Sequence, residues 1–147
     1  MHSIKEFMSK HGIHGEFLTF EQSCHTAQEA ADASGAQIDE IVKNVCMIGS
    51  EGNLIVCIIP ATKRADLKKI SALGSKVRLA KSEEVKAKSG FEVGAVPSFG
   101  YFATFYLDKR LMEKPNIYTS GGTFNTLVKI NPHEILKHNS GEIAELT

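Results

Sequence analysis

The sequence lacks long apolar segments. No apolar run approaches the ~20 residues that a helix needs to cross a membrane. The first residues, Met1 to Phe7, alternate acidic and basic side chains and do not resemble a signal peptide. Both absences argue against a membrane or secreted protein, so we expect a cytoplasmic one. With 147 residues, of which 42% are hydrophobic and 23% charged, the composition is that of a globular protein, and the length fits a single domain spanning residues 1–147.

Cysteine is scarce, and its positions argue against two kinds of site. The three cysteines, Cys24, Cys46 and Cys57, are odd in number and form no Cys-x-x-Cys pair, so neither a disulfide framework nor a zinc site is indicated. The six histidines show no spacing typical of metalloproteases. We therefore expect no metal and no cofactor.

Three common catalytic motifs are also absent. The chain has no Gly-x-Ser-x-Gly nucleophile turn, no phosphate-binding Gly-x-x-x-x-Gly-Lys loop and no paired-carboxylate motif. Their absence favours a reaction that works by positioning a substrate.

The net charge is zero, but positive charge is concentrated in one segment. Residues 63–88 carry nine basic and three acidic side chains, a net charge of +6, whereas residues 1–62 have a net charge of −5. Such a segment can bind a phosphate backbone by releasing counterions, although a run of charge is often only a solvated face. On charge alone, both interpretations stay open.

Capping residues and apolar spacing predict short helices interleaved with strands. We expect helices over 3–12, 26–35, 65–73, 82–88 and 131–138, and strands over 16–20, 45–48, 54–59, 77–79, 101–107, 116–119 and 126–130. The turn-forming residues 49–53 join two apolar strands into a buried hairpin. Asp108 is suited to cap a short helical turn. This alternation indicates a mixed α/β or α+β sheet.

Lys43 is the charge that most needs an explanation, because it lies just before the apolar run 45–48. Burying an ammonium group costs several kcal/mol unless the group is paired or kept for chemistry. Two glycine-punctuated segments, 94–100 and 120–122, follow later in the chain. A lysine together with such loops suggests a site for an anionic ligand. The alternative is that Lys43 ends a strand and extends its ammonium group into water.

The order of these signals resembles one family, the free-standing aminoacyl-tRNA editing domains of the YbaK type, related to the editing domain inserted in bacterial prolyl-tRNA synthetase. The resemblance covers about residues 24–137 and rests on the following ordered features: the Thr26-capped alanine-rich helix, Lys43, the basic strand through Arg78, the loop 94–100, Asp108, Ser120-Gly121-Gly122 and the closing helix at Asn131-Pro132. It implies a compact, barrel-like mixed sheet with flanking short helices. It also implies hydrolysis of the ester that joins a wrong amino acid to the 3′ end of a tRNA.

The resemblance further implies the site and the partners. The family's essential lysine corresponds to Lys43, and the pair Lys43-Asn44 looks like that of the prolyl-type members, so these two are the expected catalytic residues. The expected substrate-binding residues are Gly94, Ala95, Val96, Pro97, Ser98, Phe99, Gly100, Ser120, Gly121 and Gly122. Aminoacylated tRNA is the expected partner, a cognate synthetase is left open as a second, and a monomer is the default. The Lys43-Asn44 pair alone motivates alanine or cysteine on proline tRNA as the substrate.

Two positions depart from the family pattern. Ser98 stands where family loops commonly carry a proline, which here falls one place earlier at Pro97. Leu127 stands about where some members place an aspartate. Both departures bear on the selectivity for the amino acid more than on the reaction.

The chemistry of the ester agrees with this reading. An aminoacyl ester is already reactive, so an editing enzyme needs positioning, a water molecule and hydrogen-bond donors for the oxyanion, which backbone N–H groups of a glycine-rich loop can supply. Lys43 would hold a phosphate, the ribose or the ester itself. Asn44 would hold the water or the substrate's amino group, or would only make a strand-edge hydrogen bond. Ser120 is a candidate hydroxyl ligand or an ordinary turn residue.

Two other function classes stay open at this point. One is a non-catalytic adaptor or regulatory module that binds the tRNA end without turnover, for which the Ser98 departure is the best support. The other is a general nucleic-acid binder that uses residues 63–88, whose affinity would fall steeply with salt and would not depend on the aminoacyl group.

Overall fold

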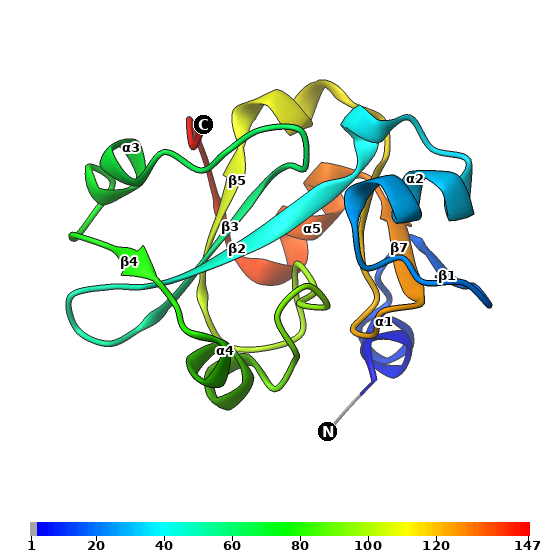
Figure 1. Cartoon of the computed structure of the whole chain (residues 1–147), viewed down its shortest axis with the longest axis horizontal. Coiled ribbons are helices and arrows are strands. Elements are labelled where there is room, and N and C mark those ends of the chain that lie inside the picture. Colours follow the sequence, from blue (N-terminus) through cyan, green and yellow to red (C-terminus); the bar gives the residue numbers. More distant parts are fainter. Residues whose placement is uncertain (1–2) are drawn as a thin grey trace.

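Two β-sheets and a set of short helices build the protein (Figure 1). The computed structural model describes residues 3–147. The helices are α1 (Ile4–His11), α2 (Ala27–Ser34), α3 (Leu67–Ser71), α4 (Ser82–Ser89) and α5 (Pro132–Asn139), with the 3-10 turns η1 (Ile38–Glu40) and η2 (Lys109–Glu113). The strands are β1 (Glu16–Thr19), β2 (Val42–Ile48), β3 (Leu54–Pro60), β4 (Arg78–Leu79), β5 (Thr104–Asp108), β6 (Ile117–Ser120), β7 (Thr126–Ile130) and β8 (Glu142–Ala144).

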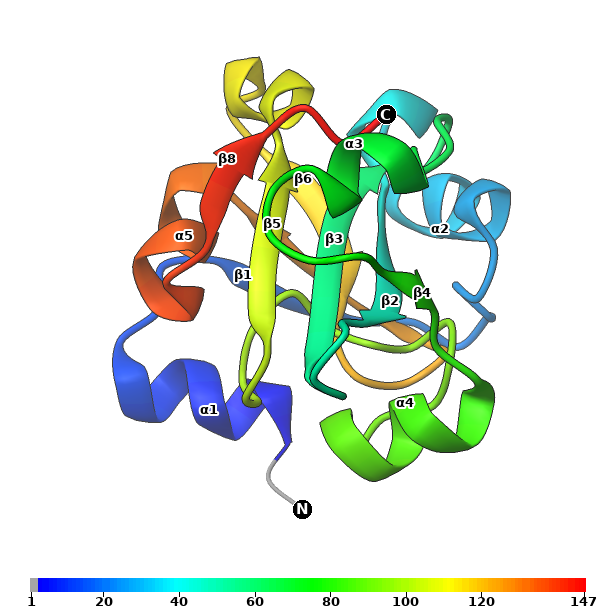
Figure 2. The ribbon, with the colours of Figure 1, turned by 90° about the vertical axis from the view of Figure 1, so that its left-hand side faces the viewer.

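The larger sheet has the order β4-β2-β3-β5-β8 and the smaller one the order β1-β7-β6. Figure 2 shows β8, β5, β3 and β2 side by side, with the smaller sheet behind them. The predicted hairpin is confirmed, because β2 and β3 pair antiparallel over their whole length. β3 with β5 and β5 with β8 pair in parallel, so the sheet is mixed, as predicted.

The two sheets do not close into one barrel, in contrast to the barrel-like sheet that the resemblance implies. β4 pairs with only the last two residues of β2, Met47 and Ile48. A single bridge, between Ile41 and Tyr118, connects the larger sheet to the smaller one at the other end of β2. The α+β class with flanking helices is therefore confirmed. None of the helices formed by residues 3–147 has the length and apolarity to span a membrane.

Local capping explains the helix ends that the sequence predicts. The Thr26 side chain accepts a hydrogen bond from the Glu29 N–H at 3.1 Å, and the Glu29 carboxylate accepts one from the Thr26 N–H at 3.0 Å. Asn131 caps α5 by accepting from the His133 N–H at 2.8 Å. Asp108 caps η2, as predicted, and is fully buried. Such caps satisfy N–H groups that have no partner inside the helix.

Several predicted elements have different bounds, among them β2, which begins at Val42 and not at residue 45 and so includes Lys43 and Asn44. The helix expected over 65–73 is confined to α3, because Asp66 accepts from the N–H groups of Lys68 and Lys69 and so marks its start. The cap of α4 is Lys81, which directly precedes the predicted range 82–88, since the Glu84 carboxylate accepts from the Lys81 N–H at 2.9 Å. The strand expected over 101–107 begins later, at the first residue of β5.

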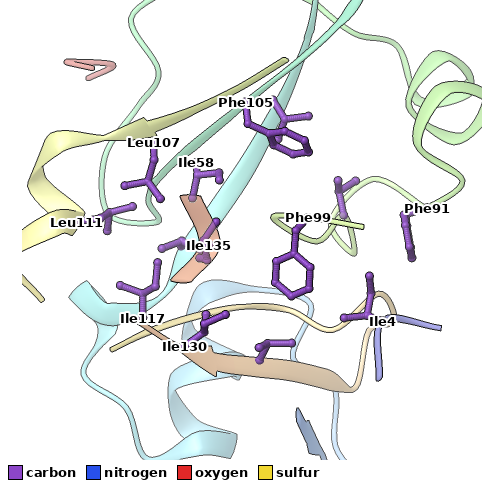
Figure 3. Packing of buried hydrophobic residues seen from close by; sticks show 14 of the residues in the cluster. Ile4, Ile58, Phe91, Phe99, Phe105, Leu107, Leu111, Ile117, Ile130 and Ile135 are labelled. Atoms are coloured by element: carbon purple, nitrogen blue, oxygen red, sulfur yellow. The ribbon is translucent and has the colours of Figure 1, made fainter. Parts of the chain in front are cut away.

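The main hydrophobic core lies between the two sheets (Figure 3). Ile58 and Leu107 from the larger sheet and Ile117 and Ile130 from the smaller one are almost inaccessible to solvent. Phe99, from the loop between α4 and β5, is fully buried in the same cluster. Burying such a side chain stabilises the fold by about 1.5–3 kcal/mol. Phe99 therefore anchors residues 94–100 to the core.

Candidate active site

A cavity of about 320 Å³ opens where α2, the start of β2 and the loop between β6 and β7 meet. Part of its wall is apolar and is formed by Ala30, Ile41, Tyr118 and Leu127. Ala30 lies on the predicted alanine face of α2, whose methyl groups are too small to fill this space. The hollow is therefore a consequence of small side chains on one helix face.

Among residues 3–147, Lys43 is the only lysine or arginine in the cavity wall, and the wall contains no aspartate or glutamate. The Lys43 side chain is exposed, and it makes no hydrogen bond or ion pair with the described residues. An unpaired ammonium group beside a cavity without carboxylates gives the site a positive potential. This arrangement suits an anionic or carbonyl-bearing ligand.

Asn44 faces the opposite side of β2 from Lys43, because successive residues of a strand point to opposite faces. Lys43 pairs with Ile59 and Asn44 with Ile58, which belong to different hydrophobic clusters. The two expected catalytic residues therefore reach the cavity region from different directions.

The Asn44 amide is fully engaged within the protein. Its Nδ2 atom donates to the Val96 carbonyl at 2.7 Å and to Thr119 Oγ1 at 3.0 Å. Its Oδ1 atom accepts from the Ser98 hydroxyl at 2.8 Å. Ser98 Oγ and Thr119 Oγ1 lie 2.7 Å apart, and both residues are fully buried. Buried polar groups need such partners, so this network ties the loop to β2 and β6.

The loop of residues 94–100, called the 94–100 loop below, has three successive carbonyl groups held by side chains. Besides the Asn44 bond to Val96, the Tyr101 hydroxyl donates to the Pro97 carbonyl at 2.6 Å, and Asn139 Nδ2 donates to the Ser98 carbonyl at 3.0 Å. Burial raises the pKa of Tyr101 well above its usual range, which keeps the hydroxyl a donor. The loop is thus secured from β2, from its own end and from α5.

Two N–H groups of the same loop, unlike these carbonyl groups, have no hydrogen-bond partner among residues 3–147. Gly94 and Val96 line the cavity, and their N–H groups have no acceptor among residues 3–147. Gly94 has a φ of +88°, and a Cβ atom there would lie 2.5 Å from Cε1 of His25, so only glycine lets the His25 ring lie against the loop. Two residues of the cavity wall therefore have N–H groups without an acceptor among residues 3–147.

The Ser120-Gly121-Gly122 segment ends β6 at the cavity. Ser120 lines the cavity, and its Oγ atom accepts from the Gly122 N–H at 3.0 Å. A Cβ atom on Gly121 would lie 2.6 Å from Oγ1 of Thr126. Ser120 therefore has the turn role that its sequence suggests, and its hydroxyl also borders the hollow.

The structure brings some of the predicted site residues to the cavity wall and leaves others behind it. Lys43, Asn44, Gly94, Val96 and Ser120 line the cavity. The remaining expected substrate-binding residues do not line it: Ala95, Pro97, Ser98, Phe99, Gly100, Gly121 and Gly122. Their contacts are with the rest of the protein, which makes them supports of the wall.

Sequence reasoning missed the following polar or aromatic residues of the wall: Cys24, His25, Thr26, Tyr118, Thr123 and Thr126. The sequence offered one signal, and only for His25, because this residue directly precedes the Thr26 cap of α2. Leu127 was noted as a departure from the family, and it does lie in the cavity wall.

No cysteine of the site is suited to act as a nucleophile. Cys24 lines the cavity, but burial and the neighbouring Glu29 raise the pKa of its thiol. Burial raises the pKa of Cys46 to about 11 and that of Cys57 to about 12. The thiolate is the reactive form, and a raised pKa disfavours it. Residues 3–147 also bring together no group of three histidine, cysteine or acidic side chains that could hold a metal ion.

The basic segment 63–88 lies away from the cavity. It runs through α3, β4 and α4, and β4 joins β2 at the end opposite to Lys43 (Figure 1). None of its residues lines the cavity. Three of its basic side chains are paired with carboxylates, in the pairs Lys69–Glu145, Arg78–Glu84 and Lys86–Glu92.

Comparisons with known proteins show the family to which the chain belongs. The protein YwhH of Bacillus subtilis (strain 168), which is uncharacterized, is 24% identical over 144 residues, covering 96% of this chain and 92% of its own length. A crystal structure of a candidate trans-editing enzyme for prolyl tRNA synthetase is 32% identical, with a TM-score of 0.90, covering 98% of this chain and 94% of that chain. The hypothetical protein APE2540 is 27% identical with a TM-score of 0.91, covering 97% of both chains. The family model of the aminoacyl-tRNA editing domain matches residues 21–138, which include the whole cavity wall, so the resemblance is confirmed and the chain belongs to the aminoacyl-tRNA editing domain family.

Proposed function

We propose that this protein is a trans-editing aminoacyl-tRNA deacylase, which hydrolyses the ester of a mischarged tRNA, with alanine or cysteine on proline tRNA as its substrates. One observation carries the proposal. Lys43, Gly94 and Val96 line the same cavity, and among residues 3–147 the Lys43 ammonium group has no partner and the Gly94 and Val96 N–H groups have no acceptor.

The reaction needs little beyond these groups. Water adds to the ester carbonyl carbon, the tetrahedral intermediate collapses, and the bond to the ribose oxygen breaks. That oxygen takes up a proton, and the products are the free amino acid and the tRNA. The negative charge that develops on the carbonyl oxygen would be stabilised by the loop N–H groups, each such donor being worth about 2.7–4 kcal/mol in other enzymes.

Lys43 has a positioning role in this proposal. Its exposed side chain lies at the cavity wall, where a flexible ammonium group can bind the terminal phosphate of the tRNA as a point charge or orient the ester. Asn44 acts on the loop and not on the substrate, since both of its amide hydrogens are already donated to protein acceptors.

The cavity wall supports a small side chain on the amino acid. Ala30, Ile41 and Leu127 offer only apolar contacts, and the described wall has no carboxylate for a cationic side chain. A hydrophobic pocket of limited volume excludes larger side chains by steric conflict but distinguishes small ones weakly. This is consistent with alanine and cysteine together as substrates.

The proposal includes the setting of the reaction. Residues 1–147 would act as one editing domain in trans, as a monomer and in the cytoplasm, where charged tRNAs are used. The likeness to a candidate trans-editing enzyme for prolyl tRNA synthetase supports aminoacylated proline tRNA as the partner and that synthetase as a second one.

A deacylation panel tests the proposal. Purified protein is mixed with Ala-, Cys-, Ser-, Pro- and Thr-charged tRNAs, and Lys43→Ala is assayed beside it. The matched control is Lys88→Ala, which removes an exposed lysine of α4 outside the cavity. We expect Ala- or Cys-tRNA to be hydrolysed, with a loss on the order of a hundredfold or more in Lys43→Ala and none in Lys88→Ala. Binding of tRNA without hydrolysis of any species would favour the adaptor instead.

A further inference from the structure

The turn between α5 and β8 reaches the 94–100 loop through one side chain. Asn139, the last residue of α5, donates from Nδ2 to the Ser98 carbonyl at 3.0 Å. Its Oδ1 atom accepts from the Gly141 N–H at 2.7 Å. The amide is thus held at both ends, with the donor directed at the loop. Asn139 does not line the cavity and lies just beyond residues 21–138, the part that the family model matches.

The backbone of this turn is unusual. Ser140 has a φ of +57° and is the only residue other than glycine with a positive φ among residues 3–147. A Cβ atom on Gly141 would lie 2.8 Å from Oδ1 of Asn139 and 3.0 Å from the Phe105 carbonyl oxygen. L side chains rarely adopt such a φ, and strained residues persist only where the surrounding structure fixes them. The turn is therefore built tightly around the Asn139 amide.

We propose that Asn139 is a positioning residue of the deacylation reaction, which holds the 94–100 loop in the conformation that presents its N–H groups to the cavity. The inference rests on the proposed function. Its physical basis is that Asn139 secures the last of three tied carbonyls, so that Val96 is fixed from β2 and Ser98 from α5. With one end released, the stretch between them gains rotational freedom, and small displacements of catalytic groups lower turnover strongly.

The planar peptide bond supplies a direct reporter of this contact. The Ser98 carbonyl and the Phe99 N–H belong to one peptide unit, so a donor that fixes the first also fixes the direction of the second. The Phe99 N–H has no acceptor among residues 3–147. Its chemical shift and hydrogen exchange therefore respond to loss of the Asn139 donor, whether or not the protein turns over a substrate.

Asn139→Asp is the sharpest variant, because it keeps an oxygen for the Gly141 N–H and replaces the donor to Ser98 by a carboxylate oxygen. Asn131→Asp is its matched control at the other end of α5. There the Nδ2 atom donates to the Pro115 carbonyl at 2.9 Å, while Oδ1 accepts from the His133 N–H. Asn131→Asp therefore replaces the same Nδ2 donor, but here the carbonyl that loses it does not belong to the loop. Asn139→Ala, paired with Asn131→Ala, repeats the test without adding charge.

We expect Asn139→Asp and Asn139→Ala to lower kcat on the order of tenfold to a hundredfold with KM within about twofold, and to shift the Phe99 amide resonance. The Asn131 variants should keep the wild-type kcat and the wild-type Phe99 resonance. Wild-type kcat in the Asn139 variants, or an equal loss in the Asn131 variants, would overturn the inference. If the wild-type protein hydrolyses no charged tRNA, the proposed function fails, and the Phe99 amide alone decides the inference. Faster hydrogen exchange at this amide in the Asn139 variants, but not in the Asn131 variants, supports the inference. Unchanged exchange overturns it.

Discussion

The two sides of the 94–100 loop are built in opposite ways. On the side that faces the protein, the carbonyls of Val96, Pro97 and Ser98 each accept from a side chain, and Phe99 is buried in the core. On the side of the cavity, which Gly94 and Val96 line, the N–H groups of these two residues have no acceptor among residues 3–147. The difference shows how a fold keeps unpaired donors in place. The carbonyl groups of the same segment are hydrogen-bonded to side chains, and these bonds fix the backbone to which the N–H groups belong.

The protein-facing side should respond to mutation mainly through stability. Ser98→Ala leaves Oδ1 of Asn44 without its donor in a network whose other two members, Ser98 and Thr119, are fully buried. An unsatisfied buried polar group costs about 1–3 kcal/mol, so we expect the free energy of unfolding to fall by that amount and kcat to fall with it. Urea denaturation and the deacylation assay measure the two effects. An unchanged stability would mean that the network does not hold the loop.

The cavity that this loop borders should respond through activity alone. Ala30→Leu places a larger side chain in the hollow, so we expect KM to rise on the order of tenfold, while the free energy of unfolding stays within about 1 kcal/mol because the space is not otherwise filled. The matched control is Ala33→Leu, on α2 but outside the cavity wall. Substrate titration and thermal denaturation check both expectations. Strong destabilisation by Ala30→Leu alone would contradict the idea of reserved space.

A site on neither side of the loop should show the smallest effect. Arg78 donates to both carboxylate oxygens of Glu84 at 2.8 Å, and this pairing, with the Lys81 N–H, lowers the pKa of Glu84 from 4.5 to about 2. A lowered pKa in the folded state stabilises the protein above the ordinary pKa, and this contribution is lost as pH falls toward the lowered value. Because the pair is exposed, we expect only a small contribution.

The measurement for this pair is urea denaturation of the wild-type protein and Glu84→Gln between pH 6 and pH 2. The difference in unfolding free energy should shrink as the pH falls, with activity unchanged at neutral pH. A difference that stays constant over this range would show that the ion pair is not its cause.

Local signals in the sequence were enough to predict much of the fold. The Thr26 capping box, Pro132 at the start of α5 and the turn at 49–53 each act within a few residues, so the elements they define were predicted correctly. β8 was missed because it is short and largely exposed, and because its partner, β5, lies far away in the chain and pairs in parallel. The early start predicted for β5 followed the aromatic content at Tyr101, whose hydroxyl instead bonds within the loop.

The site was predictable as a set of segments but not as a geometry. Resemblance pointed to Lys43, to the 94–100 loop and to Ser120, all of which the structure places at or behind one cavity. It could not show that Asn44 uses its amide on Val96, Ser98 and Thr119, because these partners lie 52 to 75 residues away. The size of the cavity also depends on packing between distant elements, which no local pattern encodes.

The short length of β4 has a consequence for the behaviour of the protein at high concentration. β4 covers only Met47 and Ile48, so the beginning of β2 is an open sheet edge within residues 3–147 apart from the bridge at Ile41. Open edges template pairing with other chains and lead to aggregation, and lysine is a common residue that prevents it. Lys43 occupies this edge. Lys43 is therefore both the side chain that we propose to position the substrate and one of the kind that disfavours pairing of an open edge with another chain.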